Sequence, residues 1–538
     1  MFETDYSGYD EKIAAGLIRR QTDYEDVQGK LKLLMDKYLY LKINNIDMDT
    51  IFSEQNLNEF IMYGYGCQGK WLKNELKSDI VKCIYDKKFD YNKKQIVDGS
   101  KICSDTELSE SELPIVITPF YNTHQIIAEL MKRGIKRKRI IPLSLIIDIE
   151  FEDKLLKGLN TVNIAWNCEN TYLITGAQFK NKGAQSMLFV AMSELRQKHP
   201  ECQIFFMPVD GWSSYSTELQ RKFKFRLVKY DIMDPDSFIY RLIPQISAII
   251  DVGGYALSSN WNSEYVVQIY SIAELNDIPL YLMPQSYGPF DFVKDFDFRV
   301  KRGLEHAKVV FAREYSTLEL LREKYGLRNV RYSNDLVLQN EKINWNNIYV
   351  CESDINDFDE NVINGNNNVG IVPNIRNYEF GNKDSILKAY YVIITYLLKC
   401  NKKIVIFSHS NDMEACNDIY NMFKDKENVK LYSKRLECYE YCKMVKKFEF
   451  LIVSRYHAIV HAYKENIPCV AIGWSEKYYE LLDIFEQSKY VIDVRKEINC
   501  NYAVSILDYM NSSWKEEKYK IKTILSKVQE QNCFDIVE

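Results

Sequence analysis

The sequence has no C-x-x-C pair, no long apolar run and no extended basic stripe. Its thirteen cysteines are odd in number and scattered along the chain. This pattern fits neither a zinc framework nor a disulfide framework. We therefore expect a chain whose cysteines stay reduced in the cytoplasm.

Signals for secretion or membrane insertion are also missing. The first five residues are acidic and lack an apolar segment, so we expect no secretory signal peptide. The longest apolar stretch, residues 140–149, contains Pro142 and Asp148 and is too short to span a bilayer. The expected location is the cytoplasm, with at most a peripheral association at the inner face of the membrane.

Basic residues cluster at one place only, residues 132–139, while the net charge is −5 and the pI about 5.9. Such a cluster is more often a solvated helix end than a nucleic-acid patch, so we expect no nucleic-acid partner. The chain is 46% hydrophobic and 27% charged, which is typical of a folded protein and excludes a largely disordered one.

The length of 538 residues predicts about three domains. Short apolar runs alternate with helical stretches, a pattern typical of α/β domains with parallel sheets. A first region, 1–150, is predicted to be helical to about residue 50 and then to form a small Rossmann-like α/β domain. Regions 160–345 and 346–538 each repeat the alternation, and an Asn-rich loop at 361–368 precedes the strands of the last region. The predicted strands lie at 60–63, 81–86, 115–117, 140–141, 172–174, 203–207, 248–251, 279–282, 309–311, 369–372, 404–407, 429–431, 450–453 and 469–472.

The first region contains a glycine pattern between a predicted strand and a predicted helix. Gly64, Gly66 and Gly69 match G-x-G-x-x-G, and Asp86 ends the next strand. This spacing suits a nucleotide, because glycines let a phosphate approach the backbone and an acid holds a ribose hydroxyl. The alternative is that the glycines only close a strand–helix turn. The segment resembles the small Rossmann-like domains that accompany sugar-biosynthesis enzymes, often without assigned chemistry.

Arg455, Tyr456 and His457 open a predicted helix directly after the apolar run 450–453. Backbone N–H groups at a helix start attract carboxylates and phosphates. The segment therefore predicts an anion site at the carboxyl edge of a parallel sheet. The alternative is that Arg455 pairs with a structural carboxylate and His457 merely occupies the start of the helix.

Other predicted strands of regions two and three end in residues suited to a ligand. Asn181, Lys182 and Gly183 lie on a loop at a helix start, and paired glycines follow the strand at 248–251. Arg313 ends the strand at 309–311, where a surface salt bridge is the alternative to a binding role. Glycine pairs and Gly-Pro are first of all turn residues, so each motif alone is weak.

In combination these motifs resemble the polysaccharide pyruvyl transferases over residues 170–490. The resemblance rests on the order and spacing of the motifs. The sequence departs from the family pattern at three positions: Tyr255 replaces a third glycine, Ala184 replaces an acid, and Ser316 comes one position early. The motifs are Asn181-Lys182-Gly183, Gly253-Gly254, Gly288-Pro289, Arg313-Glu314-Tyr315-Ser316, Asp335, Arg455-Tyr456-His457-Ala458 and Lys477.

The resemblance implies two doubly wound Rossmann-like halves in a glycosyltransferase-B-like arrangement. It implies phosphoenolpyruvate as donor, a saccharide or lipid-linked saccharide as acceptor and a cyclic ketal as product, in cell-surface polysaccharide synthesis. Arg313 and Arg455 would bind the donor because a guanidinium fork holds carboxylate and phosphate bidentately. The N–H groups of Tyr456 and His457 would assist. We expect the two guanidinium groups to converge on one crevice without being neutralised by acids.

His457 is the first candidate for proton transfer, since imidazole titrates near neutral pH, and His409 is the second. The resemblance places Asn181, Lys182, Gly183, Gly253, Gly254, Tyr255 and Lys477 on the acceptor side or in its loops. No resident cofactor is expected beyond the nucleotide considered for the first region. No Asp/His cluster has metal-ligand spacing, and the chemistry needs no metal.

Two other functions stay open from the sequence. A nucleotide-sugar glycosyltransferase could bind its diphosphate at Arg455 and hold the donor through Glu476. A non-catalytic sugar-binding subunit is the other. The acceptor, the stereochemistry of the ketal and a homo-oligomeric state are not predicted.

Overall fold

The computed structural model describes residues 27–90, 95–156, 164–166, 168–211, 215, 217–355, 358, 363 and 365–538. These residues form two compact units. Unit 1 draws on Met1–Leu173, His199–Met207 and Gly211–Ile249, and unit 2 on Ile174–Lys198, Pro208–Asp210 and Ile250–Glu538. The predicted helix before residue 27 and part of the Asn-rich loop lie outside the described residues. The division into two units does not test the predicted domain boundaries, because one compact unit can contain more than one sheet.

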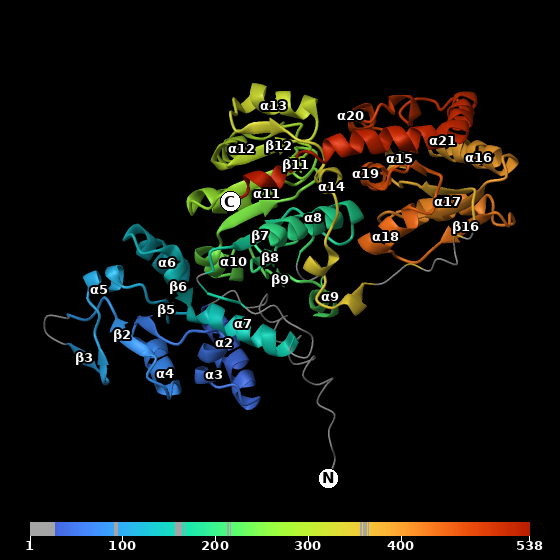
Figure 1. Cartoon of the computed structure of the whole chain (residues 1–538). Helices are drawn as coiled ribbons and strands as arrows, with labels where there is room; N and C mark the ends of the chain where they lie inside the picture. Colours follow the sequence, from blue (N-terminus) through green and yellow to red (C-terminus); the bar gives the residue numbers. More distant parts are fainter. Residues whose placement is uncertain are drawn as a thin grey trace, which may run out of the picture. The chain divides into compact units, whose positions relative to one another are not determined.

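Unit 1 contains a small parallel sheet with the strand order β2-β1-β5-β6 (Figure 1). Its strands are β2 (Val81–Tyr85), β1 (Phe60–Tyr63), β5 (Ile115–Ile117) and β6 (Ile140–Pro142), and its helices include α2 (Val27–Ile43), α3 (Met48–Glu54), α4 (Cys67–Glu75), α6 (Thr123–Lys132) and α7 (Leu143–Leu156). Pro142 is tolerated because β6 is an edge strand. The apolar stretch 140–149 therefore forms an edge strand followed by the start of α7.

The basic cluster at 132–139 is used inside unit 1. Arg139 donates hydrogen bonds to the carbonyl oxygens of Leu108 (3.1 Å) and Leu113 (2.9 Å). Arg133 forms an ion pair with Asp105. These contacts give the cluster a structural role, but the expectation of a solvated helix end is wrong for Arg139, whose side chain is buried.

The first part of unit 2 places parallel strands beside one another so that their carboxyl ends meet. Its elements are α8 (Lys182–Lys198), α11 (Glu264–Leu275), β11 (Leu280–Gln285), α12 (Lys294–His306), β12 (Val309–Ala312), α13 (Tyr315–Tyr325), β13 (Val330–Tyr332) and α14 (Leu336–Gln339), and it includes the ends of β7 (Thr171–Thr175) and β10 (Ala248–Asp251). β11 pairs with β12 and β12 with β13, all in parallel. Beyond these strands, Ser286 N–H bonds to Gly254 O at 3.0 Å and Arg313 N–H to Gln285 O at 3.2 Å.

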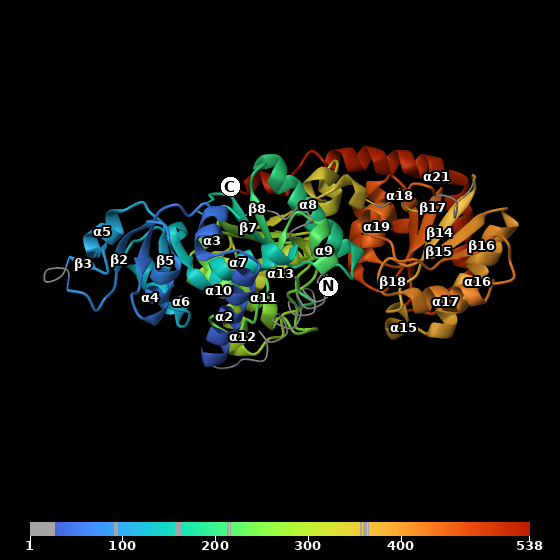
Figure 2. The same ribbon diagram turned by 90° about the horizontal axis from the view of Figure 1, so that it is seen from below.

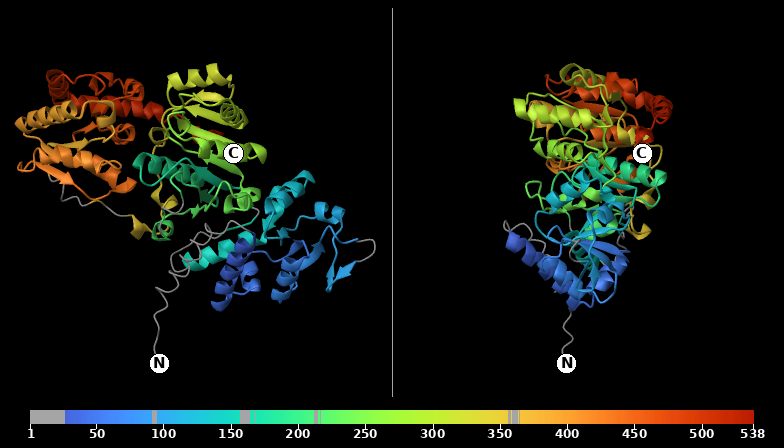
Figure 3. Two further views of the ribbon diagram at one scale, coloured as in Figure 1. Left: turned by 180° about the vertical axis from the view of Figure 1, so that it is seen from behind. Right: turned by 90° about the vertical axis from the view of Figure 1, so that its left-hand side faces the viewer.

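The second part of unit 2 is a six-stranded parallel sheet with the order β16-β15-β14-β17-β18-β19. The strands are β14 (Asn368–Val372), β15 (Lys403–Phe407), β16 (Val429–Tyr432), β17 (Phe450–Val453), β18 (Cys469–Gly473) and β19 (Val491–Asp493). Helices lie on both sides of these strands (Figures 2 and 3), among them α16 (Lys383–Lys399), α17 (Met413–Asn421), α18 (Cys438–Val445), α19 (Tyr456–Lys464), α20 (Glu476–Ile484) and α21 (Cys500–Val528).

This strand order determines where a ligand should bind. The chain leaves β14 toward β15 on one side and leaves β17 toward β18 on the other, so the order reverses between these two strands. Open α/β sheets bind ligands outside the carboxyl ends of the strands at such a switch point. The α/β class with parallel, Rossmann-like sheets is thereby confirmed. Among the described residues, every helix is too short or too polar to cross a bilayer.

Candidate active site

A cavity of about 430 Å³ opens at the switch point of the second sheet, within unit 2. Residues from both parts of the unit line it, and no aspartate or glutamate is among these described residues. They are Gly176, Gln178, Asn181, Ala184, Met187, Val209, Gly254, Tyr255, Ala256, Trp261, Asn262, Tyr265, Val266, Arg313, Asn374, Arg376, His409, Arg455, Tyr456, His457, Trp474, Lys477 and Tyr478.

Arg455 is positioned by the strand–helix junction that the sequence indicated. It follows β17 as the N-cap of α19, with an extended backbone. Its Nε donates to Asp412 Oδ2 at 2.9 Å, and its Nη2 donates to the other oxygen of the same carboxylate. Asp412 is fully buried and also accepts the N–H of Ile375 at 3.1 Å. Among the described residues, no hydrogen bond uses Arg455 Nη1.

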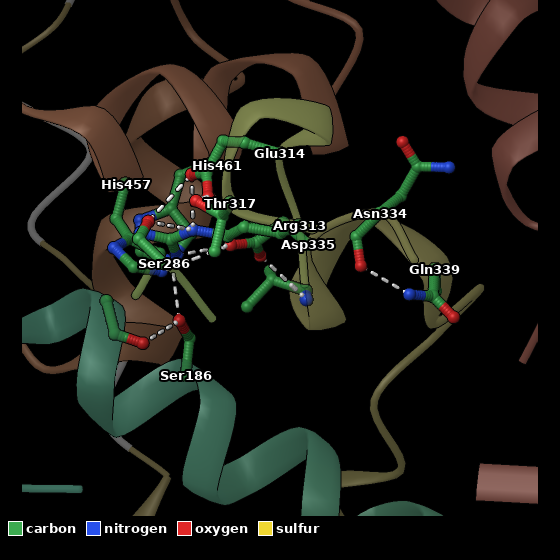
Figure 4. A network of polar contacts seen from close by, with 12 residues as sticks. Ser186, Ser286, Arg313, Glu314, Thr317, Asn334, Asp335, Gln339, His457 and His461 are labelled. Carbon is green, nitrogen blue, oxygen red and sulfur yellow. Dashed lines mark hydrogen bonds and ion pairs between the residues drawn. The ribbon is translucent and has the colours of Figure 1, made fainter. Parts of the chain in front are cut away.

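Arg313 lies in a second polar network at the end of β12 (Figure 4). Its Nε donates to Ser286 Oγ (3.0 Å) and Glu314 Oε1 (3.1 Å), and its Nη1 donates to Asp335 Oδ2 (3.1 Å). The guanidinium carbon lies 4.2 Å from the centre of the Tyr456 ring. In the described part of the chain Arg313 Nη2 has no acceptor.

The two arginines line one cavity, as the sequence predicted, but the expectation that no acid neutralises them is wrong. Asp412 pairs with Arg455, and Asp335 and Glu314 pair with Arg313. A buried guanidinium without a carboxylate nearby would be strongly destabilising, which explains the pairing. The acids do not line the cavity, and each guanidinium keeps one NH₂ group without a protein acceptor among the described residues. The charged groups that line the cavity are therefore cationic, although the acids that balance the two arginines lie close to them.

His457, the second residue of α19, joins the Arg313 network. Its Nε2 lies 3.5 Å from Asp335 Oδ2, within ion-pair range, and makes no hydrogen bond in the described structure. Burial lowers the pKa of His457, and the nearby Asp335 offsets part of that effect. Burial would raise the pKa of Asp335, but His457 and Arg313 outweigh it and hold this pKa at about 2. A neutral imidazole thus lies against an ionised carboxylate.

The glycine motifs are explained by close packing around His457. A Cβ on Gly183 would overlap the His457 ring. A Cβ on Gly254 would lie 3.5 Å from His457 Cε1 and 3.6 Å from Arg313 Nη1. Gly253 N–H donates to Asp251 Oδ1 at 2.8 Å, and this carboxylate also limits the space beside Gly176. The groups that a Cβ at Gly183 or Gly254 would meet are therefore side chains of the site itself.

We expect Gly183→Ala to displace the His457 ring. Overpacking at such a site costs about 1–3 kcal/mol of unfolding free energy, and a shift of about 1 Å in a catalytic group can lower turnover about 100-fold. Thermal unfolding and steady-state turnover measure the two effects. Gly66→Ala is the control away from the cavity, because Gly66 precedes α4 with a negative φ and a methyl group there would have nothing within 4 Å. Normal turnover in the Gly183 variant would contradict the packing argument.

Lys182 and His409 take part in a buried series of polar contacts. Lys182 Nζ donates to the carbonyl oxygen of His409 at 2.8 Å. His409 Nε2 lies 3.3 Å from His461 Nδ1, and His461 Nε2 lies 3.0 Å from Ser186 Oγ. Burial lowers the pKa of His409 well below its ordinary value, with a further contribution from His461. His409 reaches the cavity, whereas Lys182 ties α8 to the loop after β15.

The remaining predicted acceptor-side residues lie at or near the wall. Asn181 lines the cavity and accepts the N–H of Gly183 through Oδ1 at 2.9 Å. The Tyr255 hydroxyl donates to Gly288 O at 2.7 Å, which fixes its ring against the cavity. Lys477 also lines it. The structure thus brings these residues to the same cavity as the two arginines.

The glycine pattern of unit 1 has mainly a packing role in this structure. A Cβ on Gly69 would collide with the carbonyl of Gly64, which itself has φ +93°. Gly66 is the N-cap of α4 and has open space around it. Asp86 accepts the N–H groups of Tyr65 (2.6 Å) and Lys88 (2.9 Å), one on each carboxylate oxygen. A nucleotide at this loop remains a prediction, and the contacts favour the turn-closing alternative.

Sequence reasoning left several residues of the site without a role. Asp335 appeared only as part of the motif order, and its contact with His457 was not foreseen. Asp412 lies three residues after His409 on the loop that follows β15. This position at a strand end was the only feature of the sequence that could have indicated its role. The other residues of this group are Glu314, Arg376, His461, Ser186 and Trp474.

One family of known proteins matches the part of the chain that contains the site. A model of the family described as "Polysaccharide pyruvyl transferase" matches residues 181–476. No protein of curated function matches the sequence. Solved structures similar to this chain include a UDP-GlcNAc 2-epimerase from Methanocaldococcus jannaschii, at 11% identity and a TM-score of 0.43, covering 63% of this chain and 92% of that one. A glycosyltransferase from Rickettsia africae is similar at 11% identity and a TM-score of 0.41, covering 67% of this chain and 97% of that one.

The family match contains both arginines, His457 and the glycine motifs that pack around it. It spans more than half of the 538 residues. The chain belongs to the polysaccharide pyruvyl transferase family.

Proposed function

We propose that this protein transfers a pyruvyl group from phosphoenolpyruvate to two hydroxyls of one sugar, forming a cyclic ketal on a cell-surface polysaccharide or its precursor. One observation carries the proposal. Arg313 and Arg455, from different sheets of unit 2, line one cavity that has no acidic lining residue among those described.

The donor's chemistry suits this wall. Phosphoenolpyruvate carries a carboxylate and a phosphate on one enol carbon, so it needs at least two cationic groups in fixed directions. The NH₂ groups of Arg313 and Arg455 that lack protein acceptors would supply them. The start of α19, with the N–H groups of Tyr456 and His457, would add backbone donors. Asp335 and Asp412 hold the two forks in place when the donor is absent.

His457 would take the proton of the attacking sugar hydroxyl. Its lowered pKa keeps the ring neutral at physiological pH, which a general base requires. Asp335, 3.5 Å from Nε2, would stabilise the imidazolium that forms. The enol carbon gains a proton, phosphate leaves and the second hydroxyl closes the ketal. The acceptor is proposed to be a saccharide, free or lipid-linked.

The glycosyltransferase alternative has less support in the site. Glu476, its candidate for holding a nucleotide-sugar donor, does not line the cavity. It is mostly exposed and forms an ion pair with Arg495 at 3.0 Å. The acid that a glycosyltransferase mechanism would use is therefore paired with Arg495 and does not line the cavity.

The test incubates the protein with phosphoenolpyruvate and a panel of methyl glycosides bearing free diols, and separately with UDP-sugars and the same acceptors. We expect phosphate release that depends on an acceptor, and no UDP release. The product should contain a carboxyethylidene group by mass and NMR. UDP release without phosphate release would transfer the assignment to glycosyl transfer, and neither release would favour the non-catalytic alternative.

A further inference from the structure

Lys477 differs from the other cationic side chains of the cavity. Arg313, Arg455 and Arg376 each form an ion pair with a carboxylate. Lys477 forms neither an ion pair nor a hydrogen bond among the described residues, although it is half-buried and lines the cavity. The burial of this ammonium group must therefore be explained by contacts other than ion pairs and hydrogen bonds.

Aromatic rings surround this ammonium group. Its Nζ lies 5.1 Å from the ring centre of Tyr255, 5.6 Å from that of Trp474 and 6.0 Å from that of Tyr456. Such rings stabilise a cation without removing its proton-donating capacity.

The same rings locate Lys477 within the cavity. Tyr456 also stacks with Arg313, at 4.2 Å, on the side proposed for the donor. Tyr255 contacts Trp261 with 4.5 Å between ring centres, on the side rich in neutral polar and aromatic residues. Lys477 therefore lies where a donor bound to Arg313 would meet a sugar.

Burial, more than the neighbouring charges, makes Lys477 a ready proton donor. Its pKa is lowered to about 8, mainly by burial; Arg313, Arg376 and Arg455 contribute to the lowering, and Glu314 opposes it. The ammonium form thus predominates at neutral pH while its proton is held less tightly than in an ordinary lysine.

Three other titratable residues of the cavity, Tyr255, Tyr478 and His457, are less suited to donate a proton. The hydroxyls of Tyr255 and Tyr478 already donate to the carbonyl oxygens of Gly288 and Ser454. His457 is neutral and lies against Asp335, which suits a base.

We propose that Lys477 is the general acid that protonates the methylene carbon of the enolpyruvyl group. The proposal rests on the pyruvyl-transfer function and adds a second proton-transferring residue to it. The N–H bond of Lys477 breaks, and the π electrons of the enol form the new C–H bond of the methyl group. A sugar oxygen bonds to the central carbon, and the hydroxyl proton passes to His457.

The second step returns Lys477 to its starting state. The bond from the central carbon to the phosphate oxygen breaks, and phosphate leaves with the electron pair. The second sugar hydroxyl bonds to that carbon and gives its proton to the neutral Lys477 amine. His457 gives its proton to the departing phosphate. One diol proton thus replaces the proton transferred to the methyl group, the other leaves with phosphate, and no oxidant or reductant is consumed.

The experiment compares the wild-type protein with Lys477→Arg, which keeps the positive charge but releases no proton at usable pH. Phosphate release from phosphoenolpyruvate is followed from pH 6 to pH 10 with an acceptor that supports it. Because the acid must be protonated, wild-type kcat/KM should fall as pH rises above about 8, the pKa of Lys477 in the free protein. We expect Lys477→Arg to lower kcat by about 100-fold or more, to lose this fall, and to leave the KM for phosphoenolpyruvate within about threefold.

A second measurement does not depend on turnover or on the folding of a variant. In wild-type protein with ¹³C-labelled lysine, the Lys477 signal should titrate near pH 8 by NMR, with Lys477→Arg used for assignment. Titration above pH 10, or a Lys477→Arg enzyme with normal kcat or an unchanged alkaline fall, overturns the proposal. Absence of phosphate release in the wild-type protein would instead reject pyruvyl transfer, and the NMR titration would still report on Lys477.

Discussion

Replacing Arg455 by lysine should lower kcat/KM for phosphoenolpyruvate by about 100- to 1000-fold. The guanidinium uses Nε and Nη2 to hold Asp412 and leaves Nη1 without a protein acceptor among the described residues, so one side chain can serve two partners in fixed directions. An ammonium group can serve only one of them well. Each hydrogen bond to a charged group contributes about 1.5–3 kcal/mol, and losing one or two gives the expected range.

Arg495→Lys is the matched control. Arg495 also forms a bidentate pair with an aspartate, donating from Nε at 3.0 Å and from Nη2 at 2.6 Å to Asp493. It belongs to the same sheet region but does not line the cavity. We expect near-normal kcat/KM in this variant. If the two substitutions had equal effects, or if Arg455→Lys kept its activity, Arg455 would not be a donor-binding residue.

A strand could be predicted from the sequence where it consists of one uninterrupted run of buried apolar residues. The run Phe450–Val453 is β17 with the predicted bounds. β11 shows the limit: the prediction stopped at residue 282, whereas the strand continues to Gln285 through Pro284. A proline removes a ladder hydrogen bond, and here the register shifts between Leu282 and Gln285. Proline and glutamine therefore concealed the end of a strand that carries Ser286 into the site.

The site was predictable where a motif is local, and not where it depends on distant partners. Arg455 and His457 adjoin one strand, so a single segment revealed them. Asp412 precedes Arg455 by 43 residues, and Asp335 follows Arg313 by 22. Folding alone brings these carboxylates to the guanidinium groups, so no local pattern could predict the neutralised pairs. The isolation of Lys477 from acids is likewise a property of the folded cavity.

Asp335→Asn should both destabilise the protein and change its pH–activity profile. Asparagine has the same shape and can still cap α14, where Asp335 Oδ1 accepts the N–H of Val337 at 3.0 Å. The substitution therefore removes mainly a buried negative charge between Arg313 and His457. Breaking a buried pair costs about 3–5 kcal/mol; we expect the lower end, about 3 kcal/mol, because Arg313 keeps Glu314.

The pH dependence of stability follows from the depressed pKa of Asp335. This pKa is about 2 in the folded protein against an ordinary value of 3.8. The difference corresponds to about 2 kcal/mol, which is present above pH 4 and is lost as pH falls toward 2. Urea unfolding of the wild type between pH 5 and pH 2.5 should show this loss, and Asp335→Asn should show a smaller slope.

Activity should respond through His457. Asp335 raises the pKa of this histidine, so its replacement by asparagine lowers that pKa further. Since a general base must be neutral, the acid limb of kcat/KM should move to lower pH. The maximal rate should fall about 10- to 100-fold, because the imidazolium formed during the reaction loses a charged partner.

Asp47→Asn separates these effects from those of a capping aspartate in general. Asp47 is the N-cap of α3, accepts the N–H of Thr50 and has its pKa lowered to about 2, chiefly by a hydrogen bond with Lys77. It is partly exposed and far from His457 in the sequence, so we expect a loss of about 0–1 kcal/mol and an unchanged pH–activity profile. An equal loss of stability in the two variants would show that capping, rather than the buried charge, explains the effect. An unmoved acid limb in Asp335→Asn would remove Asp335 from control of His457, and with it the assignment of this imidazole as the base.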